Sequence, residues 1–326
     1  MKFLSYFLST LLIFLIFTSC QKKEEAITDQ KKIRVITTLF PLYDFAKRIG
    51  QEKADVSLLL PPGVEAHDFE PSPADMRRIQ NADIFIYTGS SMEPWVEKLL
   101  QSVDTKRLLV IDTSLGINLI KGHHEHNEGE VSDSSRRQEN DHFYGHKSDN
   151  LDPHIWLDFS NAIKMVDTIM AGYINRNPQN QDVYRKNANE YKKELESLDK
   201  KYKNTLSSCK NRVIIHAGHF VFGYLAKRYD LKYISAYKGF TPDSEPTPKR
   251  LVEIIKTLKK YDLKTIYYEE LITPKVAETI SKETGCNLLM IHGAHNISKE
   301  DMDRGVTFIS LMEKNLENLK IGMQCP

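Results

Sequence analysis

Residues 33–60 of the sequence read IRVITTLFPLYDFAKRIGQEKADVSLLL. The apolar runs at 33–39 and 55–60 predict two β-strands, and the segment 41–49 between them predicts a helix that begins at a proline. A strand, a helix and a second strand in succession are typical of a βαβ unit, whose strands are parallel. This stretch therefore predicts an α/β fold built on a parallel sheet.

The same alternation continues to the end of the chain and gives each half four strands. We expect strands at 33–39, 55–60, 83–88 and 108–111, and then at 212–216, 232–235, 264–268 and 287–291. Helices are expected at 41–49, 73–80, 93–103, 221–229, 248–261, 274–284 and 300–320. The predicted fold class is thus α/β with two similar lobes, each a parallel sheet flanked by helices.

The two lobes are separated by a long polar segment. Residues 182–206 contain no glycine or proline, and their apolar side chains recur at helical spacing among many lysines and glutamates. We expect one long helix here that joins the lobes; a coiled-coil or partner-binding helix is the alternative. The expected divisions are an N-terminal lobe at 33–158, a helical linker at 159–207 and a C-terminal lobe at 208–326.

The overall composition is that of an ordinary globular protein. Of the 326 residues, 40% are hydrophobic and 27% charged, with a formal net charge of +1 and a pI of about 7.7. A nearly neutral chain lacks the basic surface that attracts nucleic acid. We therefore expect no nucleic-acid partner, and we expect a monomer.

The N-terminus departs from this composition. Residues 3–17 form an apolar run, shorter than the roughly 20 residues that span a bilayer, and the run leads into Thr18-Ser19-Cys20. Small residues before a cysteine resemble a bacterial lipoprotein cleavage site. We expect a signal peptide at 1–19, a lipidated Cys20 that anchors the protein outside the cytoplasm, and a flexible tether at 20–32. An uncleaved anchor and simple secretion are the alternatives.

Three cysteines remain after Cys20, and an oxidising compartment allows one disulfide among them. Cys209 lies just before an expected strand, and Cys325 lies at the C-terminus. Their pairing would tie the tail to the second lobe, although Cys286 could compete.

The eleven histidines fall into two populations. Five belong to a hydrophilic insertion at 121–150: His123, His124, His126, His142 and His146. The other six are His154, His295 and four that lie at the carboxyl ends of expected strands: His67, His216, His219 and His292. In open parallel sheets ligands bind outside these ends, and imidazole is a good zinc ligand. The pattern predicts a metal site in the cleft between the lobes.

At these positions the chain resembles a known family. The motifs are GVEAHDFEPSP at 63–73, DPHIWLD at 152–158, HFVFGYL at 219–225 and PKVAET at 274–279. Together they resemble the zinc- and manganese-type substrate-binding proteins of ABC transporters, over essentially everything after the tether. The resemblance implies two α/β lobes, a connecting helix and a buried metal site, with His67, His154 and His219 as ligands.

The fourth ligand stays open at this point. Members of the family often place a carboxylate after the last strand, where this sequence has His292-Gly293-Ala294-His295. We choose His292, with His295, Glu269, Glu270 or water as alternatives. His216 is expected to pack beside a ligand or to orient it through a hydrogen bond.

The donor set indicates the cargo. Imidazole nitrogens favour Zn2+, whereas Mn2+ prefers more carboxylate oxygen, so a manganese- or iron-binding member of the family is the alternative. The implied function is to bind the metal without catalysing a reaction and to deliver it to a permease. Rivals from other classes are a secreted zinc hydrolase, which the absence of HExxH disfavours, and a metal-dependent adhesin.

The insertion at 121–150 has two interpretations. Its polar composition predicts disorder. Its clustered histidines and acids could bind zinc weakly and raise the local zinc concentration near the cleft. The alternative is a tolerated surface loop.

Overall fold

The structure is a computed structural model that describes residues 32–67, 69–122, 151–237, 239–240, 246–271 and 273–326. The predictions for the signal peptide at 1–19, for Cys20, for the tether up to residue 31 and for residues 123–150 of the insertion lie outside this part. Within it, a helix with the length and apolar character needed to cross a membrane is absent.

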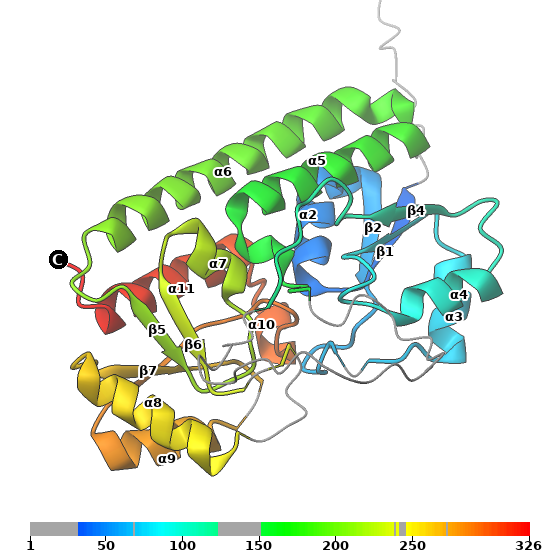
Figure 1. Ribbon diagram of the computed structural model, residues 1–326. Helices are drawn as coiled ribbons and strands as arrows, with labels where there is room; N and C mark the ends of the chain where they lie inside the picture. Colours follow the sequence, from blue (N-terminus) through cyan, green and yellow to red (C-terminus); the bar gives the residue numbers. More distant parts are fainter. Residues whose placement is uncertain (1–31, 68, 123–150, 238, 241–245, 272) are drawn as a thin grey trace, which may run out of the picture. The chain divides into compact units, whose positions relative to one another are not determined.

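Two four-stranded parallel sheets form the framework (Figure 1). The first sheet has the order β2-β1-β3-β4 and the second the order β6-β5-β7-β8, so the same winding occurs twice. The strands are β1 (Ile33–Thr37), β2 (Ala54–Leu58), β3 (Ile84–Tyr87), β4 (Leu109–Asp112), β5 (Val213–His216), β6 (Lys232–Ser235), β7 (Thr265–Tyr268) and β8 (Asn287–Met290). All eight predicted strands, and the predicted fold class, are confirmed.

The helices follow the predicted alternation. Those of the first half are α2 (Phe40–Gly50), α3 (Pro73–Gln80), α4 (Trp95–Ser102), α5 (Phe159–Arg176) and the long α6 (Gln181–Ser207). Those of the second half are α7 (Gly223–Arg228), α8 (Pro248–Lys260), α9 (Lys275–Thr284), α10 (Lys299–Asp303) and α11 (Phe308–Gly322). Short 3-10 turns occur at Gln51–Lys53 (η1), Ile155–Leu157 (η2) and Pro178–Asn180 (η3).

One predicted helix was wrong. The segment 300–320 is two helices, α10 and α11, rather than one. Gly305 adopts a left-handed φ of 70°, which ends α10. Thr307 then starts α11 with a capping box, in which its side chain accepts a hydrogen bond from the backbone of Ser310.

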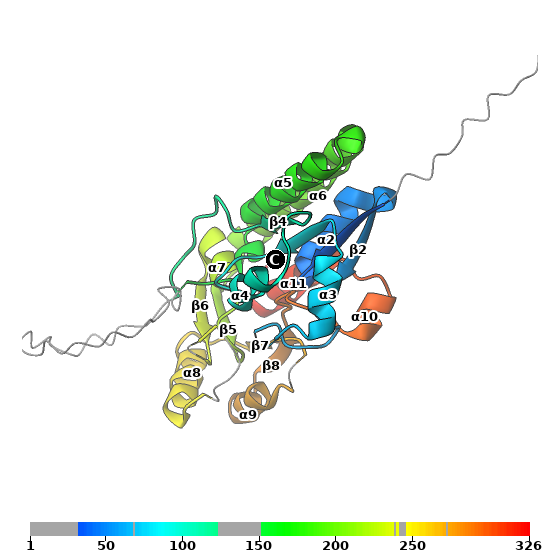
Figure 2. The ribbon, with the colours of Figure 1, turned by 90° about the vertical axis from the view of Figure 1, so that its right-hand side faces the viewer.

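Strand residues alternate between two apolar layers, as the period of a strand requires. In β1, Val35 belongs to the layer beneath the long helices, and Ile36 belongs to the layer beneath α3 and α4. In β5, Ile214 and Ile215 divide in the same way between the long-helix layer and the layer beneath α8 and α9. Figure 2 shows α5 and α6 on one side of the molecule and α8 and α9 on the opposite side.

The layer beneath the long helices is shared by both sheets. It contains Val35 and Ile84 from the first sheet and Ile214 and Tyr267 from the second. Helix α6 runs along it (Figure 1) and contributes Tyr184, Tyr191, Leu195, Leu198 and Tyr202. The two sheets are therefore joined by one continuous apolar core as well as by the chain.

Polar contacts fix α6 to both halves. The hydroxyl of Tyr191 donates to the carboxylate of Asp44 in α2 at 2.9 Å, and Asp44 also accepts from the backbone N–H of Phe308 at the start of α11. Further along α6, the hydroxyl of Tyr202 donates to the carbonyl of Met312. A disulfide joins Cys209 to Cys325 and leaves Cys286 as a buried free thiol, which confirms the predicted pairing.

Candidate metal centre

Four histidines from four separate loops meet at the carboxyl ends of the strands. His67 lies between β2 and α3, His154 directly before η2, His219 between β5 and α7, and His295 between β8 and α10. Parallel winding brings these loops to the same edge of each sheet, and the two edges face each other. Four histidines that are spread between positions 67 and 295 of the sequence thereby form one cluster.

The geometry of the cluster is close to tetrahedral. One ligand atom from each of the four residues lies within 4.8 Å of the others. The six distances between ring centroids all fall between 4.8 and 5.7 Å. Four points with six nearly equal separations are the corners of a tetrahedron, so the four rings surround one central point, as the ligands of a four-coordinate zinc ion do.

The nitrogen atoms that face the centre of the cluster have no partner. Among the residues that the structure describes, the Nε2 atoms of His67, His154, His219 and His295 are buried and lack a hydrogen bond. A buried polar atom without a partner is costly, and four such atoms in one place share the same explanation. The lone pairs of these four nitrogen atoms could all be donated to one metal ion.

The opposite ring nitrogens of three ligands face buried carboxylates. Nδ1 lies 2.7 Å from Asp152 in His154, 2.5 Å from Glu269 in His219 and 3.6 Å from Glu270 in His295. Asp152 makes a hydrogen bond with Nδ1 of His154, while Glu269 and Glu270 lie within ion-pair distance of the other two rings. A carboxylate in such a position favours a proton on Nδ1 and leaves the Nε2 lone pair free for a metal. The three acids also offset the charge of a divalent cation.

Burial and neighbouring charges set different pKa values for the ligands. Burial, assisted by the neighbouring imidazoles, lowers the pKa of His67 and of His154 well below the ordinary value. Burial also opposes the charged form of His295, but the hydrogen bond and charge of Glu270 outweigh it and raise the pKa of His295. Two ligands are thus neutral at physiological pH, while His295 keeps its proton to higher pH.

The fourth position differs from the one chosen from the sequence. The structure brings His295, and not His292, together with His67, His154 and His219. Nδ1 of His292 lies 2.9 Å from the backbone N of Ala294 and 3.2 Å from Glu270. Glu269 and Glu270, given as alternatives, lie behind His219 and His295 respectively.

A turn in the backbone explains why His295 takes this place. Ala294 has a left-handed φ of 61°, which is unusual for a residue other than glycine. Asn315 holds His292 in place, because its side chain accepts from the N–H of His292 at 2.7 Å and donates to its carbonyl at 2.8 Å. The chain therefore reverses after His292, and the next histidine enters the cluster.

His216 lies beside the cluster rather than in it. Its Nδ1 is 3.1 Å from the carbonyl of His219 and 3.2 Å from the hydroxyl of Tyr233. Burial lowers the pKa of His216 to about 4, so the ring is neutral. It supports the loop that carries His219, as its sequence position suggested.

Comparison with known proteins places this geometry in a family. Residues 35–322 match the family described as zinc-uptake complex component A, periplasmic. The chain belongs to this family. The resemblance drawn from the sequence motifs is thereby confirmed.

Named relatives match this chain in sequence over nearly its full length. The zinc-uptake family includes the high-affinity zinc uptake system protein ZnuA of Bacillus subtilis, which is 36% identical over 94% of this chain and 93% of its own. The zinc-binding lipoprotein AdcA of Streptococcus pneumoniae is 36% identical over 98% of this chain, which spans only 61% of AdcA. The solved Zn(II)-bound ZnuA-like domain of AdcA matches 90% of this chain and 99% of the domain, with 34% identity and a TM-score of 0.73.

Membership of the zinc-uptake family confirms the predicted class. The protein is a zinc-binding component of an uptake system that acts outside the cytoplasm, and it is not an enzyme. The alternative of a secreted zinc hydrolase is therefore excluded by the family rather than by the site alone.

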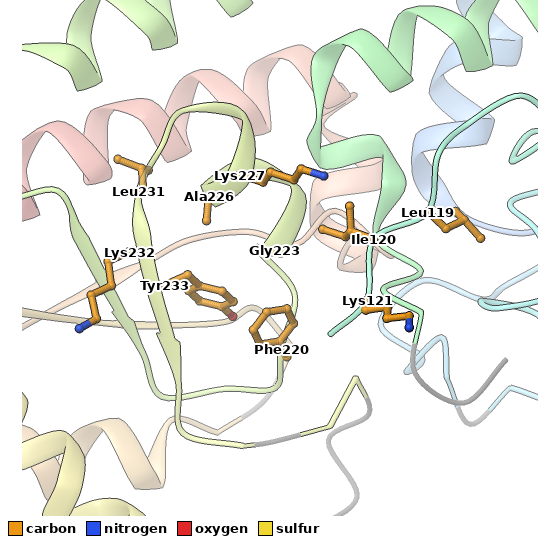
Figure 3. A pocket seen from close by; sticks show the side chains of 10 residues that line it. All are labelled: Leu119, Ile120, Lys121, Phe220, Gly223, Ala226, Lys227, Leu231, Lys232 and Tyr233. Atoms are coloured by element: carbon orange, nitrogen blue, oxygen red, sulfur yellow. The ribbon is translucent and has the colours of Figure 1, made fainter. Parts of the chain in front are cut away.

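Among the hollows lined by described residues, two of similar volume differ in whether they reach the cluster. One, of about 690 Å³, is lined by His67, Phe69, Glu70, Trp95 and Glu97 among others, and opens onto the most exposed of the four histidines. The other, of about 680 Å³, lies between residues 119–121 and the α7–β6 region, with Phe220 and Tyr233 in its wall (Figure 3). Only the first hollow reaches a histidine of the cluster.

The sequence analysis named Glu269 and Glu270 as alternative ligands and did not consider Asp152, so it missed the orienting role of these three carboxylates. Asp152 stands two residues before His154, and Glu269 and Glu270 directly follow β7. The signal was available for Asp152, because an acid that close to a metal-binding histidine is a common orienting partner. The position of Glu269 and Glu270 at a strand end could be predicted, but the histidine that each of them faces could not.

Proposed function

We propose that the protein captures one Zn2+ with the Nε2 atoms of His67, His154, His219 and His295 and hands it to the permease of an ABC transporter. The observation that carries the proposal is the convergence of four buried imidazole nitrogens without partners. Four protein ligands close a tetrahedral zinc site and leave no position for an attacking water.

The donor set supports zinc over manganese. All four inward-facing atoms are imidazole nitrogens, and the carboxylates lie behind the rings rather than among the ligands. Mn2+ favours oxygen donors and more than four of them. The names of the relatives from Bacillus subtilis and Streptococcus pneumoniae, a zinc uptake protein and a zinc-binding lipoprotein, point the same way.

The anchoring and domain divisions complete the proposal. We propose cleavage before Cys20 and lipidation of that cysteine, since small residues precede it in the sequence and a relative is named a lipoprotein. The mature protein would act as a monomer tethered by residues 20–32, with lobes at 33–158 and 208–326 joined by the linker at 159–207. Its docking partner is the permease of the same uptake complex.

The histidine-rich insertion has a separate role in this proposal. Residues 121–150 contain five histidines and several acids and lie within the range of the first lobe, 33–158. Weak zinc binding there would raise the concentration of zinc near the tight site. The tight site itself does not need these residues.

Metal analysis of protein purified without chelators tests the proposed ligands. We expect one tightly held zinc in the wild type, and loss of that zinc in His67→Ala, His154→Ala, His219→Ala and His295→Ala. His292→Ala is the matched control, because this imidazole lies outside the cluster on the same loop. Deletion of residues 123–150 should remove only weakly bound zinc.

Two results would overturn the proposed ligand set. One is full zinc occupancy and unchanged affinity in His295→Ala. The other is a loss of zinc in His292→Ala as large as in His67→Ala, which would restore the ligand chosen from the sequence.

A further inference from the structure

The segment that carries His295 is bonded to the opposite half of the molecule. Residues 293–297, here called the strap, follow β8 of the second sheet. The indole N–H of Trp156 donates to the carbonyl of Gly293 at 2.8 Å, and the backbone N–H of Phe40 donates to the carbonyl of His295 at 3.1 Å. The backbone N–H of Gly63 donates to the carbonyl of Ile297 at 2.9 Å. The strap belongs to the second lobe by sequence and is bonded to both lobes, because the backbone N–H of Gly293 also donates to Glu270 at 2.8 Å.

Asn296 makes the side-chain contacts of the strap. Its side-chain amide is fully buried, and Nδ2 donates to the carbonyls of Pro61 and Val64 at 2.6 and 2.9 Å. Its Oδ1 accepts from the backbone N–H of Ile297 at 2.9 Å. Both amide hydrogens and the oxygen are thus engaged.

The two carbonyls belong to the loop that carries another ligand. Val64 precedes His67 by three residues, and Asn296 is the neighbour of His295. The ring centroids of these two histidines are 5.5 Å apart. One buried side chain therefore ties together the two loops from which two ligands project.

We propose that Asn296 is a positioning residue for zinc, which sets the placement of His295 relative to His67 without contacting the metal. The inference rests on the four-histidine site of the proposed function. A ligand held by a second layer of hydrogen bonds is already in place before the metal arrives, and loss of such a bond typically lowers metal affinity about 10- to 100-fold.

The chemistry of the contact requires an amide. Two carbonyl acceptors need two N–H donors on one side chain, which asparagine supplies at this length. Asn296→Ala removes both donors, and Asn296→Asp keeps the size but places carboxylate oxygens against the two carbonyls. Both variants should loosen the link between the loops.

The test compares these variants with Asn318→Ala. Asn318 is also a buried asparagine of the second lobe, and its Nδ2 donates to a single carbonyl, that of Met290, at 2.7 Å. We measure zinc affinity by chelator competition and the visible absorption of bound Co2+, whose intensity reports four-coordinate geometry. Asn296→Ala and Asn296→Asp should lose about 10- to 100-fold in affinity and show weaker Co2+ absorption, while Asn318→Ala keeps both at the wild-type level.

A double-mutant cycle separates positioning from general destabilisation. His67→Ala keeps three imidazoles and only weaker zinc binding, which direct titration measures. If Asn296 acts by placing His295 relative to His67, then Asn296→Ala should lower this remaining affinity much less than it lowers the affinity of the wild type. Equal losses in the two backgrounds, or wild-type affinity and Co2+ spectrum in both Asn296 variants, would overturn the inference. Wild-type protein without a tight zinc site would instead refute the proposed function.

Discussion

At the scale of single residues, we expect His295 and Glu270 to set the pH at which protons begin to compete with zinc. His295 is the ligand whose pKa is raised, while the pKa values of His67 and His154 are lowered. A proton on a ligand must leave before the metal binds, so affinity falls as the pH falls. The first part of that fall should come from His295, near and above its ordinary pKa of about 6.5.

Replacement of Glu270 should move this pH dependence. In Glu270→Gln the charge that raises the pKa of His295 is gone, so the loss of zinc affinity should begin at a lower pH than in the wild type. Each displaced proton contributes up to about tenfold in affinity per pH unit. Zinc competition titrations between pH 8 and pH 5 measure the curve, with the exposed Glu196→Gln of α6 as control.

A different result would contradict the assigned role of Glu270. If the Glu270→Gln curve keeps the shape of the wild-type curve and is only displaced to weaker affinity, this carboxylate does not control the proton on His295.

The sequence could predict three of the four clustered histidines, because each lies in a motif or at the end of a strand. It could not choose between His292 and His295. That choice depends on the left-handed turn at Ala294 and on the bonds of Asn315 to His292, and neither is visible from residue types alone.

At the scale of elements, a disulfide ties the end of the C-terminal helix α11 to the end of α6. The disulfide between Cys209 and Cys325 joins the chain just after α6 to the residues just after α11, across 116 positions of sequence. Closing so long a loop restricts the unfolded chain, and removal of a native disulfide typically costs about 2–5 kcal/mol. Cys325→Ser should lower the free energy of unfolding by an amount in this range.

Urea unfolding of the metal-free protein measures this change. Reduction of the wild type should reproduce the loss, while Cys325→Ser should be insensitive to the reductant. Wild-type stability in Cys325→Ser, or a further loss when the variant is reduced, would contradict the assigned bond.

Element type was predictable because the periodic signals are strong, but one boundary was not. The apolar pattern of 300–320 hides the break between α10 and α11. Gly305 and Thr307 are the residues that cause it, through a left-handed φ and a helix cap. Both act on the backbone locally, and the periodicity of the side chains does not record them.

At the scale of the whole molecule, two wound sheets share one apolar core beneath α6. The sequence predicted two lobes and a connecting helix, but not that Val35 of the first sheet and Ile214 of the second would belong to the same core. Such sharing depends on packing between distant segments, which a local pattern does not encode. A common core and the bonds of the strap hold the four ligand-bearing loops together before metal arrives.

The central claim is that four imidazoles from these loops close around one zinc ion. X-ray absorption spectroscopy at the zinc edge of the fully loaded wild-type protein tests it most directly. We predict four nitrogen donors at about 2.0 Å, with the outer-shell scattering of four imidazole rings. A first shell that contains carboxylate or water oxygen, or the scattering of three rings or fewer, would contradict it.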